Sequence, residues 1–326
     1  MGCSLQKYID IKGLKDDAKK IDHQFNSGNP SELRSFLDTV NFNSYTTPLH
    51  TQEIKIVPFH RWKLNVENLI SEKIIFPSDF SYTKSDSAVF YIFRKGELTN
   101  CKVILWIPGM GVSDFAFKFI KKFFYKELSE GYNIVVYIPP FHLERKVENS
   151  NDGYLTSNTL NNVTNYLLSI RELRTINEYL QSKKVRSISL WGGSMGGSMG
   201  LQMSNYIHFE HVCIMIPIVD WYSLIVNNAQ MKNIKTRLNG VGFDDKLLQK
   251  AYSLISPINS DIKINPKKSL ILCANYDQIA RLNIVNDFAV KAGISNIIVY
   301  NRSHSTILIS NKMYTDYSNF LKLVNQ

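Results

Sequence analysis

Cysteine is scarce in this sequence of 326 residues, which contains only four. They are Cys3, Cys101, Cys213 and Cys273, and no two of them have the short Cys-x-x-Cys spacing of a zinc site or a redox motif. The last three lie at or inside apolar runs that are typical of strands. This usage argues against a zinc centre and against a disulfide framework. It fits a reducing compartment, so we expect a cytoplasmic protein.

Long apolar segments are also lacking. No apolar run approaches the roughly 18 residues that a membrane-spanning helix needs, and the opening stretch MGCSLQKYIDIKGLKDDAKK lacks the apolar centre of a secretory signal. The sequence contains no phosphate-binding loop, no dinucleotide fingerprint and no cluster of residues at metal-ligand spacing. We therefore expect no transmembrane segment, no metal and no cofactor.

Positive charge is in excess, with a formal net charge of +10. The lysines and arginines are scattered along the chain, however, and do not form the dense run of a nucleic-acid-binding arm. We expect no nucleic-acid partner, with contact to an anionic membrane surface as a minor alternative. The segment DFAFKFIKKFFYKEL is the candidate for such a membrane contact. Its pattern suits a helix on a membrane surface, but it suits better a helix that buries its phenylalanines against a sheet.

The sequence does contain a regular alternation of strand and helix patterns. Residues 1–50 predict two short helices, at 14–25 and 31–40, and we expect an N-terminal helical extension there. Over 51–326 we expect one domain in which strands alternate with helices, and this predicts an α/β fold with a mostly parallel central sheet and helices on both faces. The expected strands of the alternating part lie at 102–107, 133–138, 187–191, 212–219, 269–274 and 296–300, and the expected helices at 114–129, 157–182, 278–292 and 311–323.

The alternation is interrupted between residues 221 and about 265. This segment is too long for a plain connection, so it should contain helices of its own. We expect it to be a cap inserted at the end of a strand, where an open α/β sheet places its ligand crevice.

The stretch SISLWGGSMGGSMG, Ser187–Gly200, contains the pattern Gly-x-Ser-x-Gly twice. One large class of hydrolases uses this pattern to present a nucleophilic serine on the sharp turn between a strand and a helix. Ser194 lies three residues past Trp191, the last residue of the predicted strand, where the sharp turn is expected, whereas Ser198 lies about one helical turn further on. We expect Ser194 to be the reactive serine, and Ser198 to be a side chain of the helix that follows.

Three other loops follow predicted strands and should meet the serine at the same edge of the sheet. They contain Pro108-Gly109-Met110-Gly111, then Asp277, then His304. A serine hydroxyl becomes a good nucleophile when an imidazole accepts its proton, and a carboxylate holds that imidazole in one tautomer. Backbone N–H groups must also receive the negative charge that develops on the substrate oxygen. The loops therefore supply the groups that acyl transfer needs.

With these residues in this order, the chain from about 54 to 326 resembles the α/β-hydrolase fold superfamily of serine esterases, lipases and thioesterases. The resemblance implies that Ser194 is the nucleophile, Asp277 the acid and His304 the base. It implies an oxyanion hole formed by the N–H groups of Met110 and Met195. The implied activity is that of a carboxylesterase or acyl-thioesterase, acting on a small-molecule or lipid-like acyl substrate.

Several residues leave alternatives open. Family members often carry His-Gly before the oxyanion residue, and this sequence has Pro108-Gly109 there. Asp220 also ends a strand and is an alternative acid, or else a cap for the segment that follows. His142 and Arg145, in the stretch PPFHLERK after a strand, are candidates for binding a substrate carboxylate or phosphate, or else for ordering their loop.

Two other functions use the same fold. An acyltransferase would use the same triad, and some members of the superfamily have lost catalysis and act as binding proteins. The oligomeric state stays open.

Overall fold

The strands of the structure form one continuous mixed sheet. The computed structural model describes residues 2–49, 53–80, 86–146 and 153–326. Within these residues the strand order across the sheet is β1-β2-β3-β5-β4-β6-β7-β8-β9. The pairings from β1 to β3 and between β3 and β5 are antiparallel, and those from β5 across to β9 are parallel. The strands are Lys55–Pro58 (β1), Ile70–Pro77 (β2), Ser87–Arg94 (β3), Lys102–Ile107 (β4), Tyr132–Ile138 (β5), Ser187–Gly193 (β6), Phe209–Met215 (β7), Ser269–Ala274 (β8) and Ile297–Tyr300 (β9).

The parallel strands at the centre are buried on both faces. Every residue of β5 and β8 is buried, as is every residue of β4 and β6 except the first. The continuous apolar runs that predicted these strands therefore form the core. Trp106 of β4 and Trp191 of β6 stack with their ring centroids 3.5 Å apart. The expected mostly parallel sheet is confirmed, and its strands bring the predicted loops to one edge.

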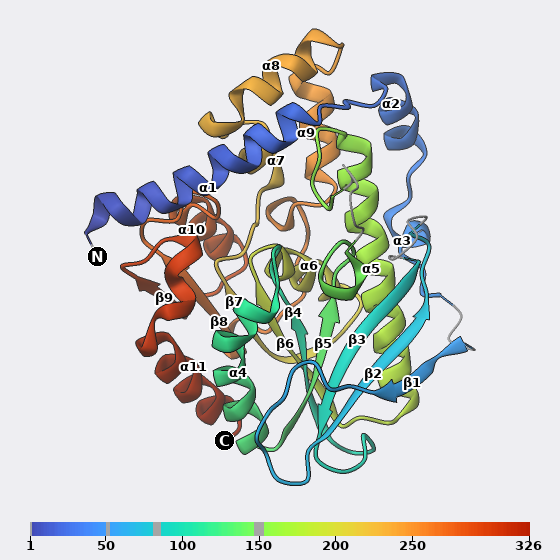
Figure 1. Cartoon of the computed structure of the whole chain (residues 1–326), viewed down its shortest axis with the longest axis vertical. Helices are drawn as coiled ribbons and strands as arrows, with labels where there is room; N and C mark the ends of the chain where they lie inside the picture. Colours follow the sequence, from blue (N-terminus) through green and yellow to red (C-terminus); the bar gives the residue numbers. More distant parts are fainter. Residues whose placement is uncertain (1, 50–52, 81–85, 147–152) are drawn as a thin grey trace.

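Helices connect and cover these strands (Figure 1). The polar residue before a helix often accepts its first free N–H groups, as Ser113 does from Ala116 at the start of α4 and Asn158 does from Asn161 at the start of α5. The helices are Cys3–His23 (α1), Pro30–Thr39 (α2), Phe42–Tyr45 (α3), Asp114–Ser129 (α4), Thr159–Ser182 (α5), Met195–Met203 (α6), Trp221–Ile225 (α7), Lys232–Gly240 (α8), Asp245–Ser253 (α9), Leu282–Lys291 (α10) and Asn311–Val324 (α11).

Helix α4 is the phenylalanine-rich segment. It buries Phe117, Phe123 and Phe124, and Phe123 packs on the Trp191 ring of the sheet. Phe119 is half-buried, and Phe115 has 68% of its surface exposed. The segment is thus mainly a core helix, as expected. In the part of the chain that the structure describes, no helix combines the length and apolarity needed to cross a membrane.

The segment at 221–265 is helical, as expected, and it contains α7, α8 and α9. Helix α1 lies beside these helices in Figure 1 and contacts α8. It also contacts a short 3-10 turn after the last strand, η6 (His304–Ile309). The N-terminal helices therefore pack on the rest of the molecule.

The predicted start of the first helix, at residue 14, is wrong, because α1 begins at Cys3. The face of α1 that is buried consists of Gln6, Asp10, Leu14 and Ala18, which lie four residues apart. Half of this face is polar, so a search for apolar periodicity detects only its second half.

Candidate active site

Ser194 occupies a sharp turn by itself. Strand β6 ends at Gly193 and α6 begins at Met195. Ser194 between them has φ 50° and ψ −117°, a strained conformation for a residue with a side chain. Its N–H donates to the carbonyl of Met215 in β7 (2.8 Å), which fixes the turn to the neighbouring strand. This is the geometry that the Gly-x-Ser-x-Gly pattern predicts for a nucleophile.

The neighbouring glycines allow this turn to close. A Cβ atom added to Gly192 would lie 2.8 Å from the Cα of Gly197. One added to Gly196 would lie 1.9 Å from the carbonyl oxygen of Ile107, at the end of β4. Both distances are far inside van der Waals contact, and the opposing atoms belong to the backbone. The glycines are therefore required by close approach of α6 to the sheet.

His304 lies between Ser194 and Asp277. Its Nε2 is 2.9 Å from Ser194 Oγ, and its Nδ1 is 2.7 Å from Asp277 Oδ2. The other carboxylate oxygen of Asp277 accepts the N–H groups of Ile279 (2.8 Å) and Ala280 (2.7 Å). The structure thus brings together the three residues that the sequence analysis selected, from the loops after β6, β8 and β9. Their order of contact is acid, imidazole, hydroxyl.

The electrostatics of this group favour a basic imidazole. The Asp277 side chain is fully buried, and 12% of the His304 side chain is exposed. Burial works against the charged imidazolium, but the adjacent Asp277 carboxylate outweighs it, so the pKa of His304 lies above its ordinary value. With Asp277 accepting at Nδ1, the proton of neutral His304 resides there, and Nε2 is the acceptor that faces Ser194.

The loop after β4 passes directly against the serine. A Cβ atom on Gly109 would lie 3.0 Å from Ser194 Cβ, a tight contact that would push the loop and the serine apart by a few tenths of an ångström. In the ranges that the structure describes, neither Met110 nor Met195 has a protein acceptor for its N–H. Met195 is the first residue of α6, where the helix leaves its N–H groups unpaired. Both predicted oxyanion-hole donors are thus unpaired, Met195 directly after Ser194 and Met110 directly after Gly109, which approaches the serine.

His142 supports this loop. Its Nε2 accepts the N–H of Gly111 (2.8 Å), and its Nδ1 then donates to the Pro140 carbonyl (2.8 Å). The side chain is buried, and burial lowers the pKa of His142, which keeps the ring neutral. Since both ring nitrogens are engaged, the substrate-binding prediction for His142 is not supported, and the alternative of ordering a loop describes its contacts.

Arg145 lies inside the fold. It is 1% exposed and forms an ion pair with Glu172 of α5 (2.7 Å). It also donates to the carbonyl of Ile138 at the end of β5 (2.8 Å). The prediction that Arg145 binds a substrate anion is wrong, because its charge is already neutralised by a buried carboxylate.

Asp220 caps a helix. Its carboxylate accepts the N–H (3.0 Å) and the hydroxyl (2.5 Å) of Ser223 in the first turn of α7, and it contacts Ser223 rather than His304. The alternative acid is therefore not the residue that bonds His304.

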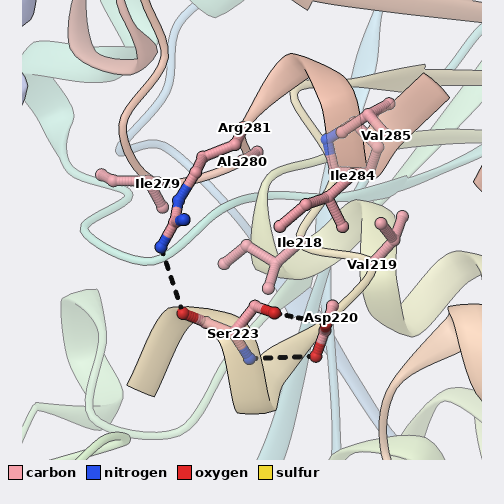
Figure 2. Close-up of a pocket in the computed structure, with 10 residues that line it drawn as sticks. Ile218, Val219, Asp220, Ser223, Ile279, Ala280, Arg281, Ile284 and Val285 are labelled. Atoms are coloured by element: carbon pink, nitrogen blue, oxygen red, sulfur yellow. Dashed lines mark hydrogen bonds between the residues drawn. The ribbon is translucent and has the colours of Figure 1, made fainter. Parts of the chain in front are cut away.

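Figure 2 shows Asp220 at a small pocket, where Arg281 donates to the Ser223 carbonyl. The pocket is lined mainly by the apolar residues Pro217, Ile218, Val219, Ile279, Ala280, Ile284 and Val285.

Ser198 is a structural residue of α6. It is fully buried, and its Oγ accepts the indole N–H of Trp221 (2.9 Å) and bonds the hydroxyl of Tyr166 (3.0 Å). It therefore links α5, α6 and α7. The expectation that the second serine is a helix side chain is confirmed.

The three cysteines whose side chains the structure describes, Cys101, Cys213 and Cys273, are free. Burial raises the pKa of each of these thiols, that of Cys273 to about 12, which disfavours the reactive thiolate. Within the described ranges, no group of three His, Cys, Asp or Glu residues could hold a metal ion.

Sequence reasoning missed two residues beside the site, Gln6 and Asp10 of α1. Both are buried, and Asp10 accepts the backbone N–H of His304 (2.8 Å). The available signal was their spacing of four residues from each other and from Leu14, which places all three on one face of a helix.

Comparison with known proteins identifies the fold of the chain through similar structures rather than through similar sequences. No protein-family model and no curated protein matches the sequence. Among solved structures, an acetyl xylan esterase from Paenibacillus sp. R4 is similar with a TM-score of 0.62 and 12% identity, over 92% of this chain and 98% of that one. A Pyrococcus furiosus esterase is similar with a TM-score of 0.50 and 16% identity, over 77% and 92%. A Pyrococcus horikoshii acylaminoacyl peptidase has a TM-score of 0.52 and 14% identity, over 79% and 42%. The chain has the α/β-hydrolase fold.

Proposed function

We propose that this protein is a serine hydrolase, which cleaves a carboxylic ester or thioester through an acyl-enzyme intermediate on Ser194. The observation that carries the proposal is the pair of hydrogen bonds of His304, to Ser194 (2.9 Å) and to Asp277 (2.7 Å). The strained turn at Ser194 and the unpaired N–H groups beside it support the same chemistry.

In the proposed first step, Ser194 Oγ attacks the acyl carbon while its proton passes to His304 Nε2. The negative charge on the substrate oxygen is received by the N–H groups of Met110 and Met195. Asp277 orients His304 and stabilises the imidazolium that forms. His304 then gives the proton to the departing alcohol or thiol as the tetrahedral intermediate collapses to the acyl-enzyme.

The second step repeats the first with water. His304 Nε2 accepts a proton from water as the water oxygen attacks the acyl-enzyme, and the same proton returns to Ser194 Oγ when the acid leaves. For the substrate we propose a small-molecule or lipid-like acyl compound. The fold that the chain shares with solved esterases supports this choice. The small pocket of Figure 2 lies on the chain beside the serine turn, since the N–H of Ile218, one of its lining residues, donates to the Ser194 carbonyl (3.2 Å).

A fluorophosphonate probe tests the proposal directly, because it forms a covalent bond only with an activated serine. We expect intact-mass measurement to show one added probe on the wild-type protein and none on Ser194→Ala, with ester or thioester hydrolysis reduced by at least about 10⁴-fold in that variant. Ser198→Ala is the matched control, since it removes the other serine of the doubled motif, and it should take up the probe.

An unlabelled wild-type protein would contradict the proposal and favour a catalytically silent binding protein. Labelling of Ser194→Ala at the wild-type rate would show that another residue is the nucleophile. If the acyl group of a substrate appears on an added alcohol or amine in preference to water, the protein is an acyltransferase with the same triad.

A further inference from the structure

Helix α1 inserts two buried polar side chains next to the candidate active site. Gln6 is 0% exposed and Asp10 is 1% exposed, although both belong to a helix at the surface (Figure 1). A polar group loses its hydration when it is buried, so each must find partners inside the protein. Those partners are the loops that present the acid and the histidine.

The Asp10 carboxylate bonds both loops at once. Its Oδ2 accepts the N–H of His304 (2.8 Å) and the N–H of Gln278 (3.2 Å), the residue after Asp277. Its Oδ1 accepts the N–H and the hydroxyl of Ser305 (both 3.1 Å). One carboxylate thus fixes the backbone of the histidine relative to the backbone beside the acid.

Gln6 secures the same histidine loop from its other side. Its Oε1 accepts the N–H of Ser303 (3.0 Å) and the hydroxyl of Thr306. Ser303 and Thr306 also form the capping box that begins η6. The polar face of α1 therefore contacts the chain before and after His304.

A carboxylate is the group that this position requires. Asp10 receives four donors on its two oxygens, and an amide in its place would offer one oxygen and direct an NH₂ group at the remaining N–H groups. No lysine or arginine within the described ranges forms an ion pair with Asp10. Its negative charge is therefore stabilised by hydrogen bonds from the two loops rather than by an ion pair.

We propose that Asp10 is a positioning residue of the active site, through which the N-terminal helix α1 holds His304 in register with Asp277 and Ser194. The proposal rests on the proposed hydrolase function. Asp10 does not contact Ser194 and acts through the backbone of the histidine loop.

The test is the second-order rate of fluorophosphonate labelling, measured against pH and expressed per folded molecule. We expect Asp10→Ala to lower this rate by roughly 10- to 100-fold, because small displacements of a catalytic base have effects of that size. Asp16→Ala is the matched control, since Asp16 is an exposed carboxylate of the same helix, and it should label at the wild-type rate.

The pH profile separates positioning from mere stabilisation. Burial disfavours the charged imidazolium, and the carboxylates of Asp277 and, to a smaller extent, Asp10 raise the pKa of His304. Labelling needs neutral His304, so the rate should rise with pH through this pKa. Asp10→Asn removes one negative charge, and we expect the rise to occur at lower pH than in the wild type.

The outcomes distinguish the two proposals. A wild-type protein that takes no label overturns the hydrolase function and the positioning role with it. If the wild type is labelled and Asp10→Ala labels within about twofold of it, the positioning role alone is overturned. If Asp10→Ala does not fold, the labelling rate of Asp10→Asn is compared with that of the wild type by the same twofold criterion. If neither variant folds, Asp10 is a folding determinant and the proposal is rejected.

Discussion

The turn that presents Ser194 and the loop that presents His304 are held in different ways. The serine turn is fixed by backbone atoms in close contact, between neighbours in sequence and the end of the adjacent strand β4. The histidine loop follows β9, a short strand at the edge of the sheet with one buried residue. Its hydrogen bonds with Asp10 join residues 294 or 295 positions apart in the chain.

This difference determines which substitutions can displace Ser194 and which can displace His304. Close backbone contacts leave no room for a second arrangement, so the serine turn is either formed or lost together with the sheet. Hydrogen bonds from one remote side chain can be removed while the core stays intact. The histidine is therefore the member of the group whose position a single distant substitution should change.

The largest effect is expected for Gly196→Ala. Its Cβ atom would lie 1.9 Å from a backbone oxygen of β4, which cannot move without displacing the sheet. We expect the free energy of unfolding, measured by urea denaturation, to fall by more than about 4 kcal/mol. Gly13→Ala is the control in α1, where nothing lies within 4 Å of an added Cβ, and it should raise stability by about 0.5–1 kcal/mol. A stable, fully labelled Gly196→Ala protein would show that the serine turn tolerates rearrangement.

A smaller effect is expected for Ser198→Ala, which removes a polar contact below the serine turn. The substitution leaves the Trp221 indole N–H and the Tyr166 hydroxyl without their shared partner in a buried site. We expect a loss of about 1–3 kcal/mol in the free energy of unfolding, with fluorophosphonate labelling retained. Ser35→Ala, at an exposed position of α2, should change stability by less than about 0.5 kcal/mol. Loss of labelling by a folded Ser198→Ala protein would mean that the serine turn depends on polar contacts as well.

The two regions also differ in how far sequence could predict them. The serine turn is encoded locally, because a strand pattern, glycines and a serine stand together in one short stretch, and the choice of Ser194 over Ser198 followed from their distance to the strand. Asp277 and His304 could be selected because each follows an apolar strand. The support of His304 by α1 could not, since the four-residue spacing places Asp10 on one helix face with Gln6 and Leu14 but does not show which loop that face contacts.

Arg145 shows the same limit. Its place after a strand suggested an arginine available to a substrate, but its partner is Glu172, within a helix pattern in which a glutamate is ordinarily exposed. Buried polar pairs join residues whose neighbourhood is set by the fold, and a pattern of apolar residues contains no information about them. The errors therefore concern polar side chains that become buried.

The smallest effect is expected at the other end of α1, where Asp22 forms an ion pair with Arg237 of α8 (2.6 Å). The two side chains are 35% and 46% exposed, so water and salt screen their attraction. Arg237 also lies over the Phe25 ring, 3.9 Å from its centroid, and it retains that contact when the carboxylate is removed. We expect Asp22→Ala to change the free energy of unfolding by less than about 1 kcal/mol and labelling by less than about twofold. Asp10→Ala and Asp22→Ala each remove one carboxylate from α1, and the two variants differ only in the position of that carboxylate along the helix. If both slow labelling equally, the histidine depends on the attachment of α1 as a whole rather than on the buried carboxylate that bonds its loop.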